Sequence, residues 1–272
     1  AQFQNQLRIT SKEVNLSETA GEWASIDLVG EIPAVVNGHE ITMAQIVIAI
    51  YDGQGNQVYL DDVEVFQHEI SNAPVLSANA VKTNASKDQI LQTLDFSTGP
   101  WTAAEPFDEF LVMNKDEEPP VQTNVRLLWD DENLYVGYEN FDDNLDEMIN
   151  DTEEQNGWWV SGTNDSVETY VTADPNEAFL GFFTNPNAVK FTRYDRSQVV
   201  HPEWEASANI GSDRWNVIQA IPFAEIGVDP SQTDTLTGFF FRNYHGASVY
   251  LGWDGGAPWN PADFKPVRLI EK

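Results

Sequence analysis

Short apolar runs, separated by clusters of Gly, Pro, Asn and Asp, recur along almost the whole chain. Within these runs apolar and polar residues tend to alternate, as they do in a half-buried β-strand, and helical periodicity is scarce. The pattern predicts one short helix, at residues 87–94. The chain is therefore expected to be all-β, because strands of this kind bury their apolar faces by stacking two sheets.

The runs fall into two groups, which predict a division of the 272 residues into parts 1–75 and 76–272. The first part is a small β-rich region, either immunoglobulin-like or a set of strands added to the larger domain. A linker is expected at residues 71–86, which are rich in Asn, Ala and Ser. The second part is predicted to be a two-sheet β-sandwich with strands at 125–129, 134–138, 166–171, 179–184, 189–194, 215–221, 238–243, 248–252 and 267–270.

The chain is strongly acidic, with 44 Asp and Glu against 14 Lys and Arg and a formal net charge of −30. This charge repels nucleic acids and anionic lipids, and no apolar run approaches the roughly 20 residues of a membrane-spanning helix. We therefore expect no nucleic-acid partner and no membrane insertion. The absence of Cys excludes disulfides and thiol chemistry, and the start at Ala1 fits a mature exported protein, so an extracellular or cell-surface location is expected.

Acidic residues are concentrated between Asp108 and Glu154, where sixteen acids face two bases. A solvated loop surface explains such a cluster. A second explanation is a structural Ca²⁺ ion, because hard cations bind clustered carboxylate oxygens. The candidate ligands are Asp142, Asp143 and Asp146, although they lack the spacing and the turn glycine of an EF-hand.

An ordered series of short motifs runs through the second part of the chain. It includes Asp142-Asp143-Asn144-Leu145, Asp165-Ser166-Val167-Glu168, Ile221-Pro222-Phe223-Ala224-Glu225-Ile226-Gly227 and Trp259-Asn260-Pro261-Ala262-Asp263-Phe264. In this order and at these intervals the motifs resemble the family 9 carbohydrate-binding modules, over about residues 80–272. The resemblance implies a β-sandwich that binds sugars, often at chain ends, together with bound calcium.

The resemblance also implies that two Trp side chains hold a sugar ring between them. One is Trp259, and the other is Trp158 or Trp159, which precede the Asp-Ser-Val-Glu motif. Glu168 matches the acid that bonds to the sugar, and Asn260 beside Trp259 is a further candidate contact. These residue types suit a sugar, because indole faces pack on its C–H groups while a carboxylate accepts hydrogen bonds from its hydroxyls.

One feature departs from the family pattern. The strand after the Asp-Ser-Val-Glu motif commonly carries an Arg that reaches the sugar, but residues 179–183 hold no base, and the next bases are Lys190 and Arg193. Four other Trp residues lie in or beside predicted strands and are expected in the core: Trp101, Trp129, Trp215 and Trp253.

Motifs of catalysis are absent from the sequence. There is no phosphate loop, nucleophile elbow or zinc-protease motif, and no single Asp or Glu stands in an apolar frame that would raise its pKa. The chain is therefore interpreted as a non-enzyme.

Two functions remain open. The first is a secreted or cell-surface module that binds a polysaccharide or oligosaccharide between Trp side chains. The second is a structural subunit of an extracellular filament, in which residues 1–10 add as a strand to a neighbouring subunit.

Overall fold

The computed structural model describes residues 35–36, 39–40, 76–115, 117–153, 155, 164–174, 179–194, 198–245 and 248–271. The chain divides into two compact units, Ala1–Glu69 and Ile70–Lys272. In the first unit two short strands, β1 (Val35–Val36) and β2 (His39–Glu40), pair antiparallel. The other strands expected in residues 1–75, and the candidate donor strand at residues 1–10, lie outside the described residues.

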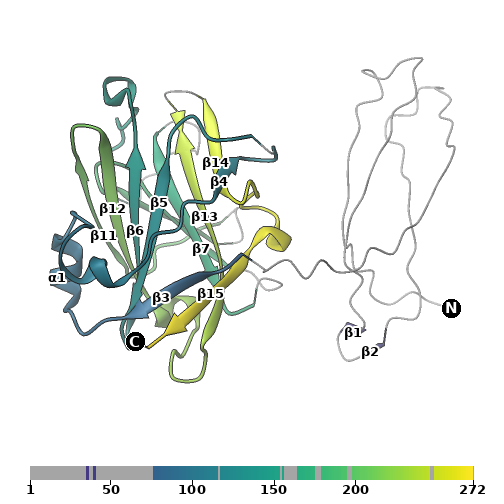
Figure 1. Ribbon diagram of the computed structural model, residues 1–272. Coiled ribbons are helices and arrows are strands. Elements are labelled where there is room, and N and C mark those ends of the chain that lie inside the picture. The colour runs from purple at the N-terminus through teal and green to yellow at the C-terminus, as the bar shows by residue number, and fades with distance from the viewer. Residues whose placement is uncertain are drawn as a thin grey trace, which may run out of the picture. The chain divides into compact units, whose positions relative to one another are not determined.

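The second unit is an all-β sandwich, as predicted, built from one continuous sheet that folds over into two layers (Figure 1). The first layer follows the order β10-β9-β8-β7-β13, and β14 and β4 branch from β13. Its strands are β4 (Phe110–Val112), β7 (Ser166–Thr172), β8 (Leu180–Thr184), β9 (Lys190–Tyr194), β10 (Gln198–Val199), β13 (Thr235–Tyr244) and β14 (Val249–Trp253).

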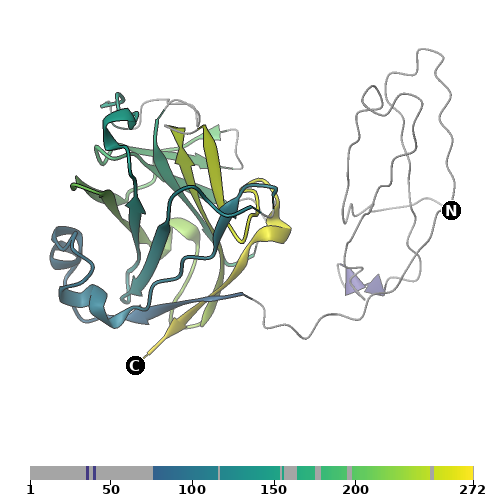
Figure 2. The same cartoon turned by 45° about the horizontal axis from the view of Figure 1, so that its top comes forward.

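The second layer follows the order β15-β3-β5-β6-β12-β11. Its strands are β3 (Ala78–Lys82), β5 (Thr123–Trp129), β6 (Asn133–Phe141), β11 (Glu205–Ile210), β12 (Arg214–Pro222) and β15 (Lys265–Ile270). β15 pairs with β13 at the fold and runs parallel to β3, beside which it lies in both views of Figures 1 and 2.

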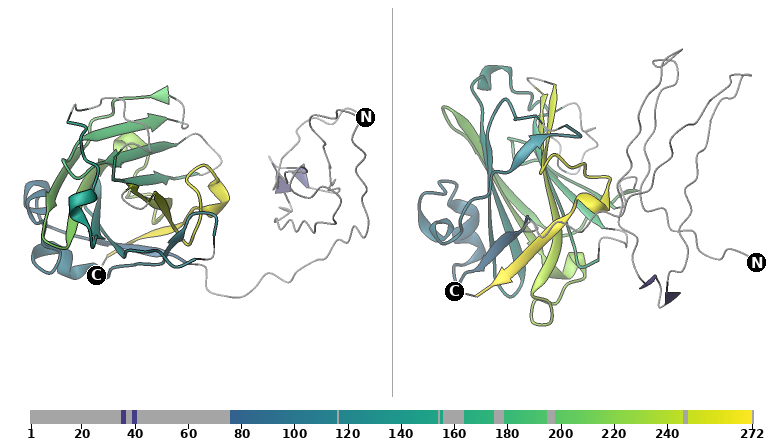
Figure 3. Two further views of the ribbon diagram at one scale, coloured as in Figure 1. Left: turned by 90° about the horizontal axis from the view of Figure 1, so that it is seen from above. Right: turned by 45° about the vertical axis from the view of Figure 1, so that its right-hand side comes forward.

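The two layers face each other in the view from above in Figure 3. An aromatic core packs between them. The ring of Tyr138 on β6 lies edge-on to Phe240 on β13, with ring centroids 6.4 Å apart. The Tyr138 hydroxyl also donates to the backbone oxygen of Glu168 on β7 at 3.0 Å. All four Trp residues expected in the core are buried, with at most 4% of their surface exposed: Trp101, Trp129, Trp215 and Trp253.

A helix covers the outer face of the second layer. Helix α1 (Lys87–Gln92) begins at Ser86, whose hydroxyl accepts the Gln89 amide at 3.3 Å, which is an ordinary N-cap. Ile90 packs with Trp101, from the 3₁₀ turn η1 (Gly99–Ala103), in a second small core. None of the helices within the described residues is long and apolar enough to cross a membrane.

Candidate functional site

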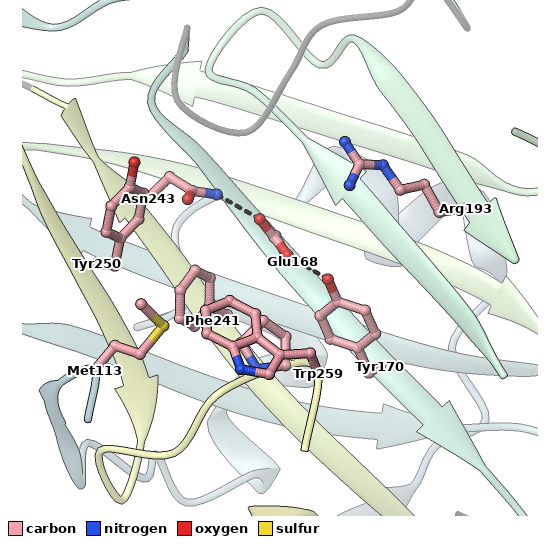
Figure 4. A pocket seen from close by; sticks show the side chains of 9 residues that line it. Met113, Glu168, Tyr170, Arg193, Phe241, Asn243, Tyr250 and Trp259 are labelled. Atoms are coloured by element: carbon pink, nitrogen blue, oxygen red, sulfur yellow. Dashed lines mark hydrogen bonds between the residues drawn. The ribbon is translucent and has the colours of Figure 1, made fainter. Parts of the chain in front are cut away.

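A pocket of about 300 Å³ opens on the outer face of the first layer. Strands β7, β9, β13 and β14 each contribute to it, as does the loop before β15 (Figure 4). The described residues that line it are Met113, Glu168, Tyr170, Arg193, Phe241, Asn243, Tyr250, Pro258 and Trp259. Two of the sequence-predicted sugar contacts, Glu168 and Trp259, are therefore brought together.

The alternation of side chains along the strands selects the pocket residues. Glu168 and Tyr170 are two apart on β7 and share a face, and so do Phe241 and Asn243 on β13. The register places Phe241 directly opposite Glu168. Neighbouring strands thus bring a carboxylate, an amide and two aromatic rings to one place.

Glu168 is almost fully buried at the base of this pocket, with 2% of its surface exposed. Its Oε1 accepts a hydrogen bond from Asn243 Nδ2 at 2.6 Å, and its Oε2 accepts one from the Tyr170 hydroxyl (Figure 4). Asn243 Nδ2 also donates to Ser166 Oγ at 2.9 Å. The carboxylate is therefore fixed in orientation before any ligand arrives.

Burial raises the pKa of Glu168 above its ordinary value, while the hydrogen bonds from Tyr170 and Asn243 and the charge of Arg193 oppose that rise. No local sequence pattern marks this shift in pKa, because no single Asp or Glu stands in an apolar frame along the chain. The neighbours of Glu168 along the chain are Val167 and Thr169. Its burial comes from Phe241 and the other rings on adjacent strands, which are distant in sequence.

Gly181 makes room for the ring of Tyr170. The two residues are opposite each other on β8 and β7, and a Cβ on Gly181 would lie 2.4 Å from Tyr170 Cε1. The ring can therefore lie across the sheet at this point, and its hydroxyl reaches Glu168. Glycine is needed here because the Tyr170 ring lies so close to its backbone. The backbone conformation does not require glycine, because φ at this position is not positive.

A basic residue does line the pocket, although β8 has none. Arg193 comes from the next strand, β9, where it pairs with Gly181. Its guanidinium lies 5.3 Å from the ring centroid of Phe183 and 5.4 Å from that of Phe191. The strand at residues 179–183 lacks a base, as the sequence shows, but the strand register brings Arg193 to the pocket from the neighbouring strand.

Trp259 stands at the pocket mouth with 48% of its surface exposed, which is high for so large an apolar side chain. Its loop folds back on β14, because the amide of Gly255 donates to the carbonyl of Gly252 at 2.9 Å. Asp263 holds the other side of the loop by accepting the Ala257 amide at 2.9 Å. The indole is therefore displayed by an anchored loop.

The other predicted sugar contacts are not among the described residues that line the pocket. Asn260 is exposed and precedes a 3₁₀ turn (Pro261–Asp263), but it is not among the residues that line the pocket. Trp158 and Trp159 lie outside the described residues.

The candidate calcium ligands lie in different environments. Asp142 is buried, where it accepts the Tyr244 hydroxyl at 3.3 Å and lies 3.6 Å from Arg242 Nη2. Asp143 and Asp146 are exposed. Within the described part of the chain no group of three or more His, Asp or Glu side chains is placed to hold a metal ion. The three carboxylates therefore do not fit a preformed site, and calcium binding stays a prediction.

If Ca²⁺ nevertheless binds this acidic segment, removing it should destabilise the protein. A ligand at 100 times its Kd stabilises the native state by about 2.7 kcal/mol, so a chelator is expected to lower the melting temperature by several degrees. Ca²⁺ should restore it better than Mg²⁺, which keeps its waters. Equal recovery with NaCl at the same ionic strength would show that charge screening alone is at work.

Comparisons with known proteins bear on this fold. Residues 98–217 match the family model described as "Carbohydrate family 9 binding domain-like". A family 9 carbohydrate-binding module from Caldicellulosiruptor kristjanssonii, solved with cellotriose, is 16% identical, with a TM-score of 0.53 over 72% of this chain and 95% of that one. The structure of such a module from the same organism with glucose gives 16% and 0.51, over 72% and 97% of the two chains.

A protein from Bacteroides uniformis, described as carbohydrate-binding, is 14% identical, with a TM-score of 0.54 over 72% of this chain and all of the other. A comparison with curated proteins finds no match. At these identities the solved structures establish the fold. The predicted resemblance is confirmed: residues 98–217 match the family 9 model in sequence, and the sandwich of which they are part has the fold of those modules.

Proposed function

We propose that this protein is a non-catalytic glycan-binding module that takes the end of a sugar chain into the pocket at Trp259. The observation that supports this most directly is the exposed indole above a buried, hydrogen-bonded carboxylate. A pyranose has an apolar face of C–H groups and a rim of hydroxyls. The indole face suits the first, and Glu168 with Asn243 suits the second.

The size of the pocket supports a chain end as the ligand. At about 300 Å³ it lies at the lower limit of ligand pockets, which run from about 300 to 1,000 Å³. The end of a chain fits such a space better than a long internal stretch. Arg193 can donate to ring or hydroxyl oxygens from the side opposite Asn243 (Figure 4).

The arrangement of carboxyl groups supports binding without hydrolysis. Glycoside hydrolysis ordinarily uses two carboxyl groups about 5–9.5 Å apart, one on each side of the bond that is cleaved. Among the described residues that line the pocket, Glu168 is the single carboxyl group, and two hydrogen bonds already hold it. We therefore propose a role in holding a polysaccharide or oligosaccharide, outside the cell or on its surface.

Trp259→Ala is the test of this proposal. Because two of the related structures hold cellotriose and glucose, cellotriose is the first ligand to try. Loss of a central aromatic contact is expected to weaken its binding by at least about tenfold in calorimetric titration, while the melting temperature changes by no more than a few degrees. Tyr194→Ala is the matched control, because Tyr194 is also exposed, at 41%, but does not line this pocket. Equal affinities of the wild type and Trp259→Ala would contradict the proposed site.

A further inference from the structure

We propose that the pocket is selective for an amino sugar, a pyranose that carries a free, protonated amine, over its neutral counterpart. This inference rests on the proposed function, since it concerns what the same pocket selects. It is supported by three properties of the pocket: its polar end accepts hydrogen bonds, its walls are aromatic, and the protein around it is strongly acidic.

The polar end of the pocket is rich in acceptors. Asn243 is fully buried, and its Nδ2 must face Glu168 because a carboxylate accepts and does not donate. In that orientation the other amide atom, Asn243 Oδ1, is a buried acceptor that receives no hydrogen bond from the described residues. A buried acceptor without a donor is costly, so a ligand that brings one gains affinity. An ammonium group brings three N–H donors and a charge that complements the Glu168 carboxylate.

The apolar walls of the pocket also suit a cation. Tyr170, Phe241, Tyr250 and Trp259 all line it, and the rings of Phe241 and Tyr250 stack with centroids 6.3 Å apart and an interplanar angle of 13°. Aromatic faces attract ammonium groups electrostatically, and most strongly where water is excluded. The same faces pack on the C–H groups of a sugar ring, so an amino sugar can use both interactions at once.

The charges of the protein favour a cation, although one pocket residue opposes it. The formal net charge of −30 raises the local concentration of positive ligands and lowers that of uronates. Arg193 acts in the opposite sense. Its guanidinium lies over Phe183 and Phe191 on the β9 side of Glu168, whereas Asn243 is on the β13 side (Figure 4). The amine is therefore assigned to the side of Asn243 and Tyr250, away from Arg193.

Three trisaccharides with the same β-1,4-linked backbone test the inference. They are cellotriose, fully deacetylated chitotriose and N-acetylated chitotriose, which carry at C2 a hydroxyl, an amine and an acetamide. Calorimetric titration at low salt, at a pH where the amine is protonated, is expected to show the amine trimer binding at least about tenfold more tightly than cellotriose. Added NaCl should reduce that ratio.

Two variants of similar shape separate the pocket charge from the overall charge. Glu168→Gln should bring the ratio of the affinities for the amine trimer and cellotriose close to one, whatever it does to the affinity for either sugar alone. Arg193→Gln should increase the preference, since it removes the opposing charge. A preference that both variants leave unchanged would come from the general acidity of the protein and would contradict the assignment to this pocket.

The pH dependence provides an additional readout. The groups around Glu168 are Tyr170 on its own strand, Tyr138 from β6, Arg193 from β9, and Asn243 and Tyr250 from β13 and β14. Affinity for the amine trimer should rise as Glu168 ionises and fall again when the sugar amine loses its proton. Affinity for cellotriose should lack the second, high-pH fall.

The outcomes also separate the inference from the proposed function. Cellotriose binding that equals or exceeds that of the amine trimer would overturn the amino-sugar inference and leave glycan binding intact. Absence of binding by all three trimers, and by other glycans in a panel, would overturn both.

Discussion

Arg242→Met is expected to lower the free energy of unfolding of the sandwich by about 3–5 kcal/mol, because it leaves a buried carboxylate without its cation. Arg242 is fully buried, 3.6 Å from Asp142 Oδ2, and its Nη1 donates to the carbonyl of Phe141 at 2.9 Å and that of Gln122 at 3.2 Å. Burial lowers the pKa of Arg242 to about 10, which still leaves it charged at neutral pH. Thermal unfolding should show a decrease on the order of 10 °C.

Two further variants identify the cause of that loss. Arg214 is one-third exposed and pairs with the exposed Asp213 as well as with the partly buried Glu139, so Arg214→Met should cost much less. Adding Asp142→Asn to Arg242→Met should recover part of the lost stability, because the unpaired charge is removed. A melting temperature of Arg242→Met close to that of the wild type would refute the importance of this buried pair.

Gly252→Ala is expected to disrupt the sugar site through the backbone. A Cβ at this position in β14 would lie 2.1 Å from the carbonyl oxygen of Gly256, in the loop that displays Trp259. Main chain cannot rotate away as a side chain can, so the loop must shift. Overpacking of this kind costs about 1–3 kcal/mol, and a displaced indole should weaken glycan binding at least about tenfold.

Gly211→Ala provides the control for this substitution. Gly211 lies in the turn between β11 and β12, where a Cβ would meet the carbonyl oxygen of Arg214 at 3.2 Å, a much milder contact. Both variants should be compared by thermal unfolding and by titration with the same oligosaccharide. If Gly252→Ala bound as tightly as Gly211→Ala, the loop would not depend on this close approach.

All nine strands that period-two alternation predicts in the second unit are present, and each of their ends lies within three residues of the predicted one. The segment expected to be a linker, residues 71–86, instead contains β3, which lies between β15 and β5. β3 reads Ala-Asn-Ala-Val-Lys, with Ser77 before it and Thr83 after it. The local sequence therefore resembles a loop, and pairing with distant strands overrides it. β11 was missed for a related reason, because Glu205–Ile210 is an edge strand with polar, partly exposed side chains.

The site was predictable only where a motif marks it. Glu168 and Trp259 were identified because each belongs to a motif of the resemblance. Tyr170 and Asn243 could have been found, since each lies two residues from another pocket residue on its strand. Arg193 could not, because its place depends on the register of β9 against β8, which no local pattern specifies.

The pairing of β15 with β3 has a consequence for how the sandwich is made. Val267 of β15 pairs with Ala78 of β3, so one half of the sheet keeps an open edge until β15 has been synthesised. During synthesis β3, β5 and β6 can associate first, but β3 then presents unpaired amides and carbonyls to any other nascent chain. Contacts so distant in sequence also slow folding. The final strand therefore acts as a closing step, and the interval before it emerges from the ribosome is when this domain is most exposed to strand exchange with another copy of itself.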